Sequence, residues 1–195
     1  MKTVFFDVDT QIDFLYPAGA LYAPGAERVV PQVAALNQYG ASKGILVIST
    51  MDAHAEDDPE FKSWPPHCVV ETAAQQKPGA TLLDKRVVLP NRSCEIAIDG
   101  TQQILLEKQT VDCFTSMHLE PLLEKLNADR YVVYGVVTEV CVKNAAFGLL
   151  KTGKRVEIVT DAIRALNEAD GAKVLADFTA AGGVLTTVAQ VTSTD

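Results

Sequence analysis

Short runs of β-branched and aromatic residues alternate along the chain with longer stretches in which apolar residues recur every three to four positions. This alternation is typical of a parallel sheet whose strands are joined by helices, and it disfavours a sandwich or a helical bundle. Most of the short runs are apolar throughout, as expected for strands that helices cover on both faces. The six predicted strands are residues 3–8, 45–50, 104–108, 131–136, 156–160 and 184–188.

Four helices are predicted between these strands, over residues 26–43, 119–127, 139–152 and 168–181. The region from about residue 52 to residue 100 contains several prolines and the only tryptophan, and it lacks a long helical pattern. We interpret it as one long functional loop region inside the domain. With 195 residues and no internal repeat or linker, the chain is expected to form a single domain over residues 1–195.

The composition argues against several classes of partner. The chain has 17 Lys and Arg against 25 Asp and Glu, a net charge of -8, whereas nucleic acids and anionic membranes are usually met by clustered basic residues. The apolar stretches are far shorter than the ~20 residues of a membrane span, so neither a transmembrane helix nor a signal peptide is expected. The four cysteines form no C-x-x-C pair, which favours a reduced, cytoplasmic location.

Reactive residue types stand where the predicted strands end, and ligands of open parallel sheets bind beyond those ends. Asp7 and Asp9 close the first strand and are expected on one face of it, because strand side chains repeat every second residue. Lys108 ends the third strand. Cys141 follows the fourth strand in the first turn of a predicted helix, where free backbone N–H groups and a neighbouring ammonium group favour a thiolate.

Each of these residues also has a purely structural interpretation. An Asp here can cap a turn, a Lys at a sheet edge usually reaches water, and a Cys is often a small buried apolar residue. That last role is the one expected for Cys68, Cys94 and Cys113. Taken together, an acid, a cation and a thiol at one crevice make a nucleophilic site, in which Cys141 attacks, Lys108 stabilises the thiolate and Asp9 moves the proton.

A second polar group lies in the loop after the second predicted strand. Asp52, His54, Glu60 and His67 supply the oxygen and nitrogen donors that suit Zn, Mn or Fe. Histidines that only complete the hydrogen bonding of the loop are the alternative, but two of the three histidines of the chain fall in this acidic segment. His118, the third, begins a predicted helix and is expected to be an exposed capping residue.

The ordered set of motifs resembles the isochorismatase-like cysteine hydrolases and, within them, the nicotinamidases. The motifs are DTQIDF at residues 9–14, GVVTEVC at 135–141, TDA at 160–162 and LTT at 185–187. The resemblance implies a three-layer α/β/α sandwich with a six-stranded parallel sheet in the order 3-2-1-4-5-6. It places the catalytic acid, lysine and nucleophile of the family on Asp9, Lys108 and Cys141.

The resemblance also implies how a substrate would be held. A peptide bond between Val136 and Val137 would be cis, and the backbone amides of Val137 and Cys141 would form an oxyanion hole. Phe14 and Trp64 would form walls of the substrate pocket. Val140 replaces a bulkier polar residue of some relatives, which bears on substrate selectivity.

The metal site implied by the resemblance binds one divalent ion, Zn, Mn or Fe, which would hold the nitrogen of a pyridine ring. Its ligands would be Asp52, His54 and His67. Glu60 stands where several relatives have a His, and it is a candidate fourth ligand because a carboxylate remains a competent ligand.

The implied reaction is hydrolysis of nicotinamide to nicotinate and ammonia through a thioester. One alternative is another small amide, such as a carbamoyl or ureido compound, and a second is a metal-binding protein on this fold without catalysis. A third is a phosphatase, because FDVD at residues 6–9 resembles the opening of the haloacid-dehalogenase-like enzymes, although Gln11 departs from their pattern. A small-molecule amide is thus the expected partner, and by analogy the chain is expected to form a homo-oligomer.

Overall fold

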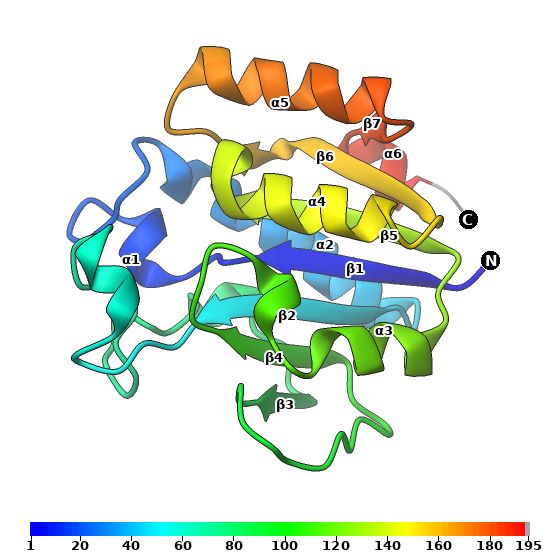
Figure 1. Ribbon diagram of the computed structural model, residues 1–195. Helices are drawn as coiled ribbons and strands as arrows, with labels where there is room; N and C mark the ends of the chain where they lie inside the picture. Colours follow the sequence, from blue (N-terminus) through cyan, green and yellow to red (C-terminus); the bar gives the residue numbers. More distant parts are fainter. Residues whose placement is uncertain (194–195) are drawn as a thin grey trace.

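In the computed structural model, which describes residues 1–193, a seven-stranded sheet lies between two layers of helices (Figure 1). All neighbouring strands are parallel. The strands are β1 (Thr3–Val8), β2 (Leu46–Asp52), β3 (Arg86–Leu89), β4 (Gln103–Lys108), β5 (Arg130–Val136), β6 (Arg155–Arg164) and β7 (Val184–Thr186). Their order is β3-β4-β2-β1-β5-β6-β7, so the predicted order of the six expected strands is confirmed.

The seventh strand, β3, corrects the prediction of a six-stranded sheet. It lies inside the region expected to be a loop, and it pairs with β4 at the edge of the sheet. The strand has only four residues, and just one of them, Leu89, is buried. So short and exposed a segment shows no periodicity that a sequence pattern can detect.

The helices are α1 (Ile12–Leu15), α2 (Val30–Ser42), α3 (Leu119–Leu126), α4 (Lys143–Leu150), α5 (Glu168–Ala180) and α6 (Val188–Thr192). The four predicted helices are confirmed as α2 to α5, with α4 preceded by a π-helical turn, η5 (Thr138–Val142). Helices α1 and α6 have only four and five residues and were not expected. Thr187 forms a capping box with Gln190, so β7 ends earlier than the sequence predicts.

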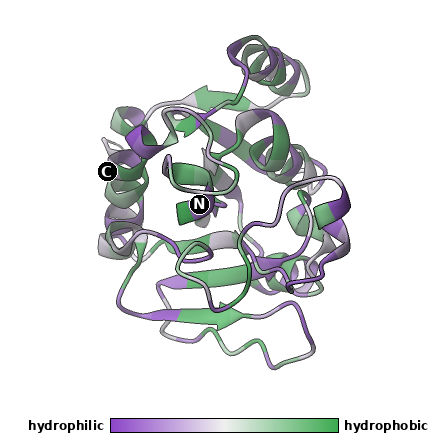
Figure 2. Ribbon diagram, turned by 90° about the vertical axis from the view of Figure 1, so that its left-hand side faces the viewer, coloured by the Kyte–Doolittle hydropathy of each residue, from purple (hydrophilic) through white to green (hydrophobic). Residues whose placement is uncertain are grey.

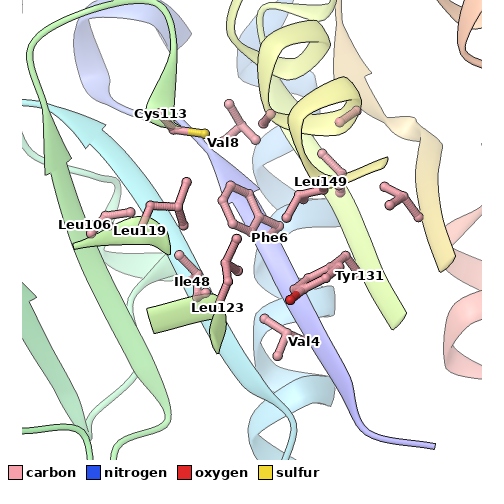
Figure 3. Close-up of a cluster of buried hydrophobic side chains, with 14 of the residues drawn as sticks. Val4, Phe6, Val8, Ile48, Leu106, Cys113, Leu119, Leu123, Tyr131 and Leu149 are labelled. Carbon is pink, nitrogen blue, oxygen red and sulfur yellow. The ribbon is translucent and has the colours of Figure 1, made fainter. Parts of the chain in front are cut away.

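Two apolar cores lie on opposite faces of the sheet. Helices α3, α4 and α5 cover one face, where Val4, Phe6 and Val8 of β1 pack beneath them (Figure 3). Phe5 points to the other face and packs with residues of α2 and α6. Figure 2 shows the strands as largely hydrophobic, while the helices present both kinds of residue. The strands are therefore buried on both sides, as the continuous apolar runs predict.

The carboxyl ends of the central strands meet at one edge of the sheet, on the left in Figure 1. At this edge Gly135 of β5 has a φ of +120°, and a Cβ there would lie 2.1 Å from the carbonyl oxygen of Val8. Only glycine allows β5 to approach β1 so closely. The turn that carries Cys141 therefore begins directly beside the end of β1. No helix within residues 1–193 has the length and apolarity needed to cross a membrane.

Candidate active site

A buried ion pair joins the ends of β1 and β4. The side chain of Lys108 is fully buried, and its Nζ lies 2.9 Å from Oδ2 of Asp9. The same ammonium group contacts Oδ1 of Asp52 and donates to the carbonyl oxygen of Thr110 at 2.9 Å. Burial alone would lower the pKa of Lys108, but the adjacent carboxylates outweigh it and raise the pKa well above its usual value. Lys108 is therefore a permanent cation that links two acids.

Asp9 does not continue the alternation of side chains between the two faces of β1. Its φ of +48° lies in the left-handed region, and its backbone N–H donates to the carbonyl oxygen of Thr50 at 3.2 Å. Thr50 Oγ1 donates to Oδ1 of Asp9 at 2.7 Å. Asp7, in contrast, pairs with Lys77 and not with Lys108. The expectation that Asp7 and Asp9 work from one face is wrong, because the positive φ redirects the chain after Val8.

Cys141 is half-buried in the π-helical turn η5, with the Asp9 carboxylate within hydrogen-bonding reach of its thiol. Burial raises the pKa of the thiol well above its usual value, Lys108 lowers it, and Asp9 and Asp52 raise it. This direction is opposite to the expectation that the surroundings of Cys141 favour a thiolate. The thiol faces a carboxylate that could accept its proton.

The peptide bond between Val136 and Val137 is cis, as the family resemblance implies. The carbonyl oxygen of Val137 accepts from the backbone N–H groups of Val140 and Val142, each at 3.1 Å. These bonds hold the backbone of the turn around Cys141.

Three buried side chains form a cluster with the donor set of a metal site. Ligand atoms of Asp52, His54 and His67 all lie within 4.8 Å of one another. Glu60 joins them, with Oε2 at 3.2 Å from Nε2 of His54. Burial would raise the pKa of Asp52, but Lys108 and the two imidazoles hold that carboxyl ionised with a pKa well below its usual range. All four predicted ligands are thus brought together.

The outer nitrogen of each imidazole lies beside an oxygen atom of the protein. Nδ1 of His67 lies 2.8 Å from the carbonyl oxygen of Pro65, and Nδ1 of His54 lies 3.0 Å from Oδ2 of Asp58. Both ring nitrogens of His54 are buried, and neither makes a hydrogen bond within the described residues. Imidazoles oriented in this way, with a free inner nitrogen beside carboxylates, fit a divalent ion. Sequence analysis missed Asp58, which follows His54 by four residues.

A cavity of about 230 Å³ is lined both by Asp9 and Cys141 and by Asp52, Glu60 and His67 of the predicted metal site. The predicted residues Phe14, Trp64 and Val140 line it, together with apolar residues that the sequence did not single out, among them Tyr22 and Leu166. The charged residues that line it are all acids: Asp9, Asp52 and Glu60. The cavity is therefore lined mostly by apolar residues, and its polar lining includes the three acids and the Cys141 thiol.

Two predictions outside the cavity are wrong. His118 is buried, not exposed, because its Nε2 lies 2.7 Å from the carbonyl oxygen of Arg92, and its side chain caps no helix N–H group. Cys94 is exposed because its segment leaves the sheet edge as a surface loop after β3. The buried apolar role is confirmed for Cys68 and Cys113, and burial raises the pKa of both thiols.

Comparison with known proteins gives a match over nearly the whole chain. The family profile described as an isochorismatase domain matches residues 3–190. The nicotinamidase of Escherichia coli is 26% identical over 207 residues, an alignment that covers 93% of each chain. The maleamate amidohydrolase of Pseudomonas putida is 24% identical over 163 residues, which cover 83% of this chain and 72% of that relative.

Solved structures show the same fold. The pyrazinamidase of Pyrococcus horikoshii, crystallised in complex with zinc, superposes with a TM-score of 0.80 and 25% sequence identity. The match covers 96% of this chain and 99% of that chain.

Proposed function

Because this chain belongs to the isochorismatase family, we propose that it is a cysteine amidohydrolase that converts nicotinamide to nicotinate and ammonia. The observation that carries the proposal is the position of the Cys141 thiol. The thiol faces the Asp9 carboxylate and lines the cavity. The same cavity is lined by Asp52 and His67, which with His54 form the metal-type cluster. Such a reaction would serve the salvage of pyridine nucleotides.

The first half of the reaction transfers the acyl group to the enzyme. Asp9 takes the proton of the Cys141 thiol as the sulfur attacks the carboxamide carbon, which forms the C–S bond. The carbonyl oxygen becomes an oxyanion, and the backbone N–H groups of Val137 and Cys141 stabilise it. When the C–N bond breaks, Asp9 gives its proton to the departing nitrogen, so ammonia and a thioester result.

The second half restores the enzyme. Asp9 takes a proton from water while the water oxygen attacks the thioester carbon. The C–S bond breaks, Asp9 returns its proton to the sulfur, and the carboxylic acid product leaves and ionises to nicotinate. Lys108 keeps its charge throughout, which favours the ionised form of Asp9 between the two halves.

Asp52, His54 and His67 would hold a divalent ion, with Glu60 as a fourth ligand. Such an ion supplies a positive charge that accepts the lone pair of a ring nitrogen. The apolar walls formed by Phe14, Trp64 and other residues suit the faces of the ring. Zn, Mn and Fe all fit this set of nitrogen and oxygen donors.

A second candidate substrate is another small amide, a carbamoyl or ureido compound, and similarity to a maleamate amidohydrolase favours keeping it. Many such compounds carry a carboxylate. The walls of the cavity are mostly apolar, with Phe14 and Trp64 among them, and no Lys or Arg of the described residues lines it. A neutral aromatic amide is therefore the better fit.

The proposal is tested by ammonia and nicotinate release from nicotinamide. Metal-loaded enzyme is expected to release both products, whereas chelated enzyme loses turnover and regains it when Zn, Mn or Fe is returned. Cys141→Ala is expected to be inactive with unchanged circular dichroism and metal content, and Cys94→Ala, which removes an exposed thiol, is the matched control. Full activity of Cys141→Ala contradicts the mechanism. If maleamate or an N-carbamoyl amino acid is hydrolysed instead, the second candidate holds.

A further inference from the structure

Leu166 is an apolar side chain that is exposed at the cavity. It lies between β6 and α5, lines the cavity, and has 48% of its surface accessible to solvent. Leu185 on β7 is similarly exposed, at 41%, but does not line the cavity. An exposed leucine by itself needs no explanation. Leu166 differs because residues on both sides of it are hydrogen-bonded to segments that carry residues of the cavity wall.

The first tie comes from Arg164, two residues before Leu166. Its Nε donates to the carbonyl oxygen of Pro24 at 2.8 Å, and its Nη1 lies 2.9 Å from Oε1 of Glu168. Pro24 ends the segment that carries Tyr22, another residue of the cavity wall. The hydroxyl of Tyr22 accepts from the N–H of Gly25 at 2.8 Å, so this segment is itself fixed. Residues 165–167 between β6 and α5 form the Leu166 loop, and the part of the cavity lining that contains Tyr22 is the Tyr22 wall. Arg164 thus joins one side of the Leu166 loop to the Tyr22 wall.

The second tie comes from Asn167, directly after Leu166. Its backbone N–H donates to Oε1 of Glu139 at 2.7 Å, and its side chain caps the first turn of α5. Glu139 stands two residues before Cys141 in the π-helical turn η5. The other side of the Leu166 loop is thus joined to the turn that carries the nucleophile.

We propose that Leu166 is a specificity-determining residue that covers the apolar face of an aromatic ring bound in the cavity. Glu139 and Arg164 are positioning residues that fix its place between the Tyr22 wall and the nucleophile turn. This inference rests on the proposed function, because the ring is that of the amide substrate. A leucine held in place loses little further conformational freedom when a ligand covers it, so contact with the ring adds to affinity. An aliphatic amide has no ring face and gains little from this contact.

The test measures binding and not turnover. Nicotinamide is titrated by calorimetry into metal-loaded Cys141→Ala enzyme, which cannot hydrolyse it, with and without Leu166→Ala. Removal of the leucine side chain is expected to weaken binding about tenfold, in proportion to the apolar surface that the ring would cover. Leu185→Ala in the same background is the matched control and is expected to bind nicotinamide unchanged.

The outcomes separate the two proposals. Equal affinity with and without Leu166→Ala overturns the inference alone. Nicotinamide that binds in a Leu166-dependent way but is not hydrolysed by the wild-type enzyme overturns the proposed function alone. Absence of binding overturns both. If Leu166→Ala changes the oligomeric state on size-exclusion chromatography and leaves affinity unchanged, Leu166 serves an interface between copies of the chain, which also overturns the inference.

The role of Glu139 is tested by its conservative variant. Glu139→Gln keeps a side-chain oxygen that accepts from the N–H of Asn167, whereas Glu139→Ala removes it. We expect Glu139→Ala to weaken nicotinamide binding severalfold, nearly as much as Leu166→Ala, and Glu139→Gln to retain wild-type affinity. If Glu139→Gln binds as weakly as Glu139→Ala, the charge and not the tie is responsible, and the positioning role is wrong.

Discussion

Two buried aspartate–lysine pairs flank the end of β1, and only one of them faces the cavity. Asp9 pairs with Lys108, and Asp7, two residues earlier, pairs with Lys77 at 3.3 Å. Both pairs are almost completely shielded from water, and both include a threonine hydroxyl that donates to the carboxylate. The chemical groups are the same, so the difference between the pairs lies in what surrounds them.

The carboxylate of Asp7 is fully used by the protein. Thr10 Oγ1 donates to its Oδ1 at 2.7 Å, and Ser49 Oγ donates to its Oδ2 at 2.8 Å. Lys77 completes the set and also donates to Thr10 Oγ1 at 3.0 Å. A carboxylate whose acceptors are all occupied has no role left except to hold the loop that carries Lys77 against the sheet.

The carboxylate of Asp9 is only partly used. Thr50 donates to Oδ1, but Oδ2 makes no hydrogen bond within the described residues and has only the ion pair with Lys108. Cys141 lies within reach of this carboxylate, and the metal-type cluster lies on the other side of Lys108. Under the proposed function, Asp9 differs from Asp7 in having an oxygen without a hydrogen bond beside the Cys141 thiol, whereas both aspartates are buried and paired with a lysine.

The largest expected effect is on turnover. Lys108→Met leaves Asp9 and Asp52 without their shared cation, so the proposed base loses the positive charge that pairs with it. We expect kcat/KM for nicotinamide to fall by about a thousandfold. Ammonia release by the folded variant measures this, and activity within tenfold of wild type would remove Lys108 from the mechanism.

Lys77→Met is expected to have the opposite profile. It leaves Asp7 as a buried carboxylate without its cation, which is expected to cost about 3–5 kcal/mol of unfolding free energy. Below its unfolding transition the folded variant retains kcat within about threefold, because Asp9 and Cys141 keep their partners. Urea unfolding and ammonia release test the two parts. A thousandfold loss of kcat with unchanged stability would break the comparison between the pairs.

A double substitution sharpens the comparison further. Asp7→Asn combined with Lys77→Met removes both charges, so no uncompensated charge stays buried. The double variant is expected to recover about 2 kcal/mol of the loss caused by Lys77→Met alone. Urea unfolding of the wild type, both single variants and the double variant completes the cycle. Strictly additive losses would show that the two residues do not interact.

The smallest effect is expected at a third ion pair, away from the cavity. Glu157 of β6 accepts from Arg130 at 2.6 Å, and burial, which raises its pKa, is outweighed by Arg130 and Arg155, which lower it. Since the folded pKa is lowered, its stabilisation is present at neutral pH and is lost as pH falls below the ordinary glutamate value of about 4.3. Glu157→Gln is expected to cost about 1 kcal/mol at pH 7. A deficit in unfolding free energy that persists undiminished at pH 3 would contradict this sign.

Sequence alone predicts the parts of the site that regular structure positions. Asp9, Lys108 and Cys141 each follow an apolar strand run, and parallel strands bring their carboxyl ends to one edge. The alternation of side chains along β1 does not extend beyond Val8. Asp9 has a positive φ, which depends on the backbone around it and leaves no signal in the sequence. The sequence pattern therefore predicts Asp7 and Asp9 on one face of the strand, although the two contact different lysines.

The other missed features depend on contacts between distant segments. Lys77 is 70 residues from Asp7 in the chain, and a lone lysine in a polar loop gives no sign of burial. Leu166 reaches the cavity only because β6 continues to Arg164, beyond the end at residue 160 that the apolar run predicts. Asp58 is the exception. Its spacing of four residues from His54 was a signal that this carboxylate lies beside the first histidine.

The most direct test of the central claim is to count how many thiols must be blocked to stop turnover. In a Cys94→Ala background three cysteines remain, and Cys141 is the one of the three that is not buried. Methyl methanethiosulfonate is added to this enzyme, and the modified residue is identified by peptide mass spectrometry. We expect loss of ammonia release from nicotinamide to follow modification of Cys141 one for one, and dithiothreitol to restore it. Undiminished turnover by enzyme whose Cys141 is fully modified would contradict the claim that this thiol performs the reaction.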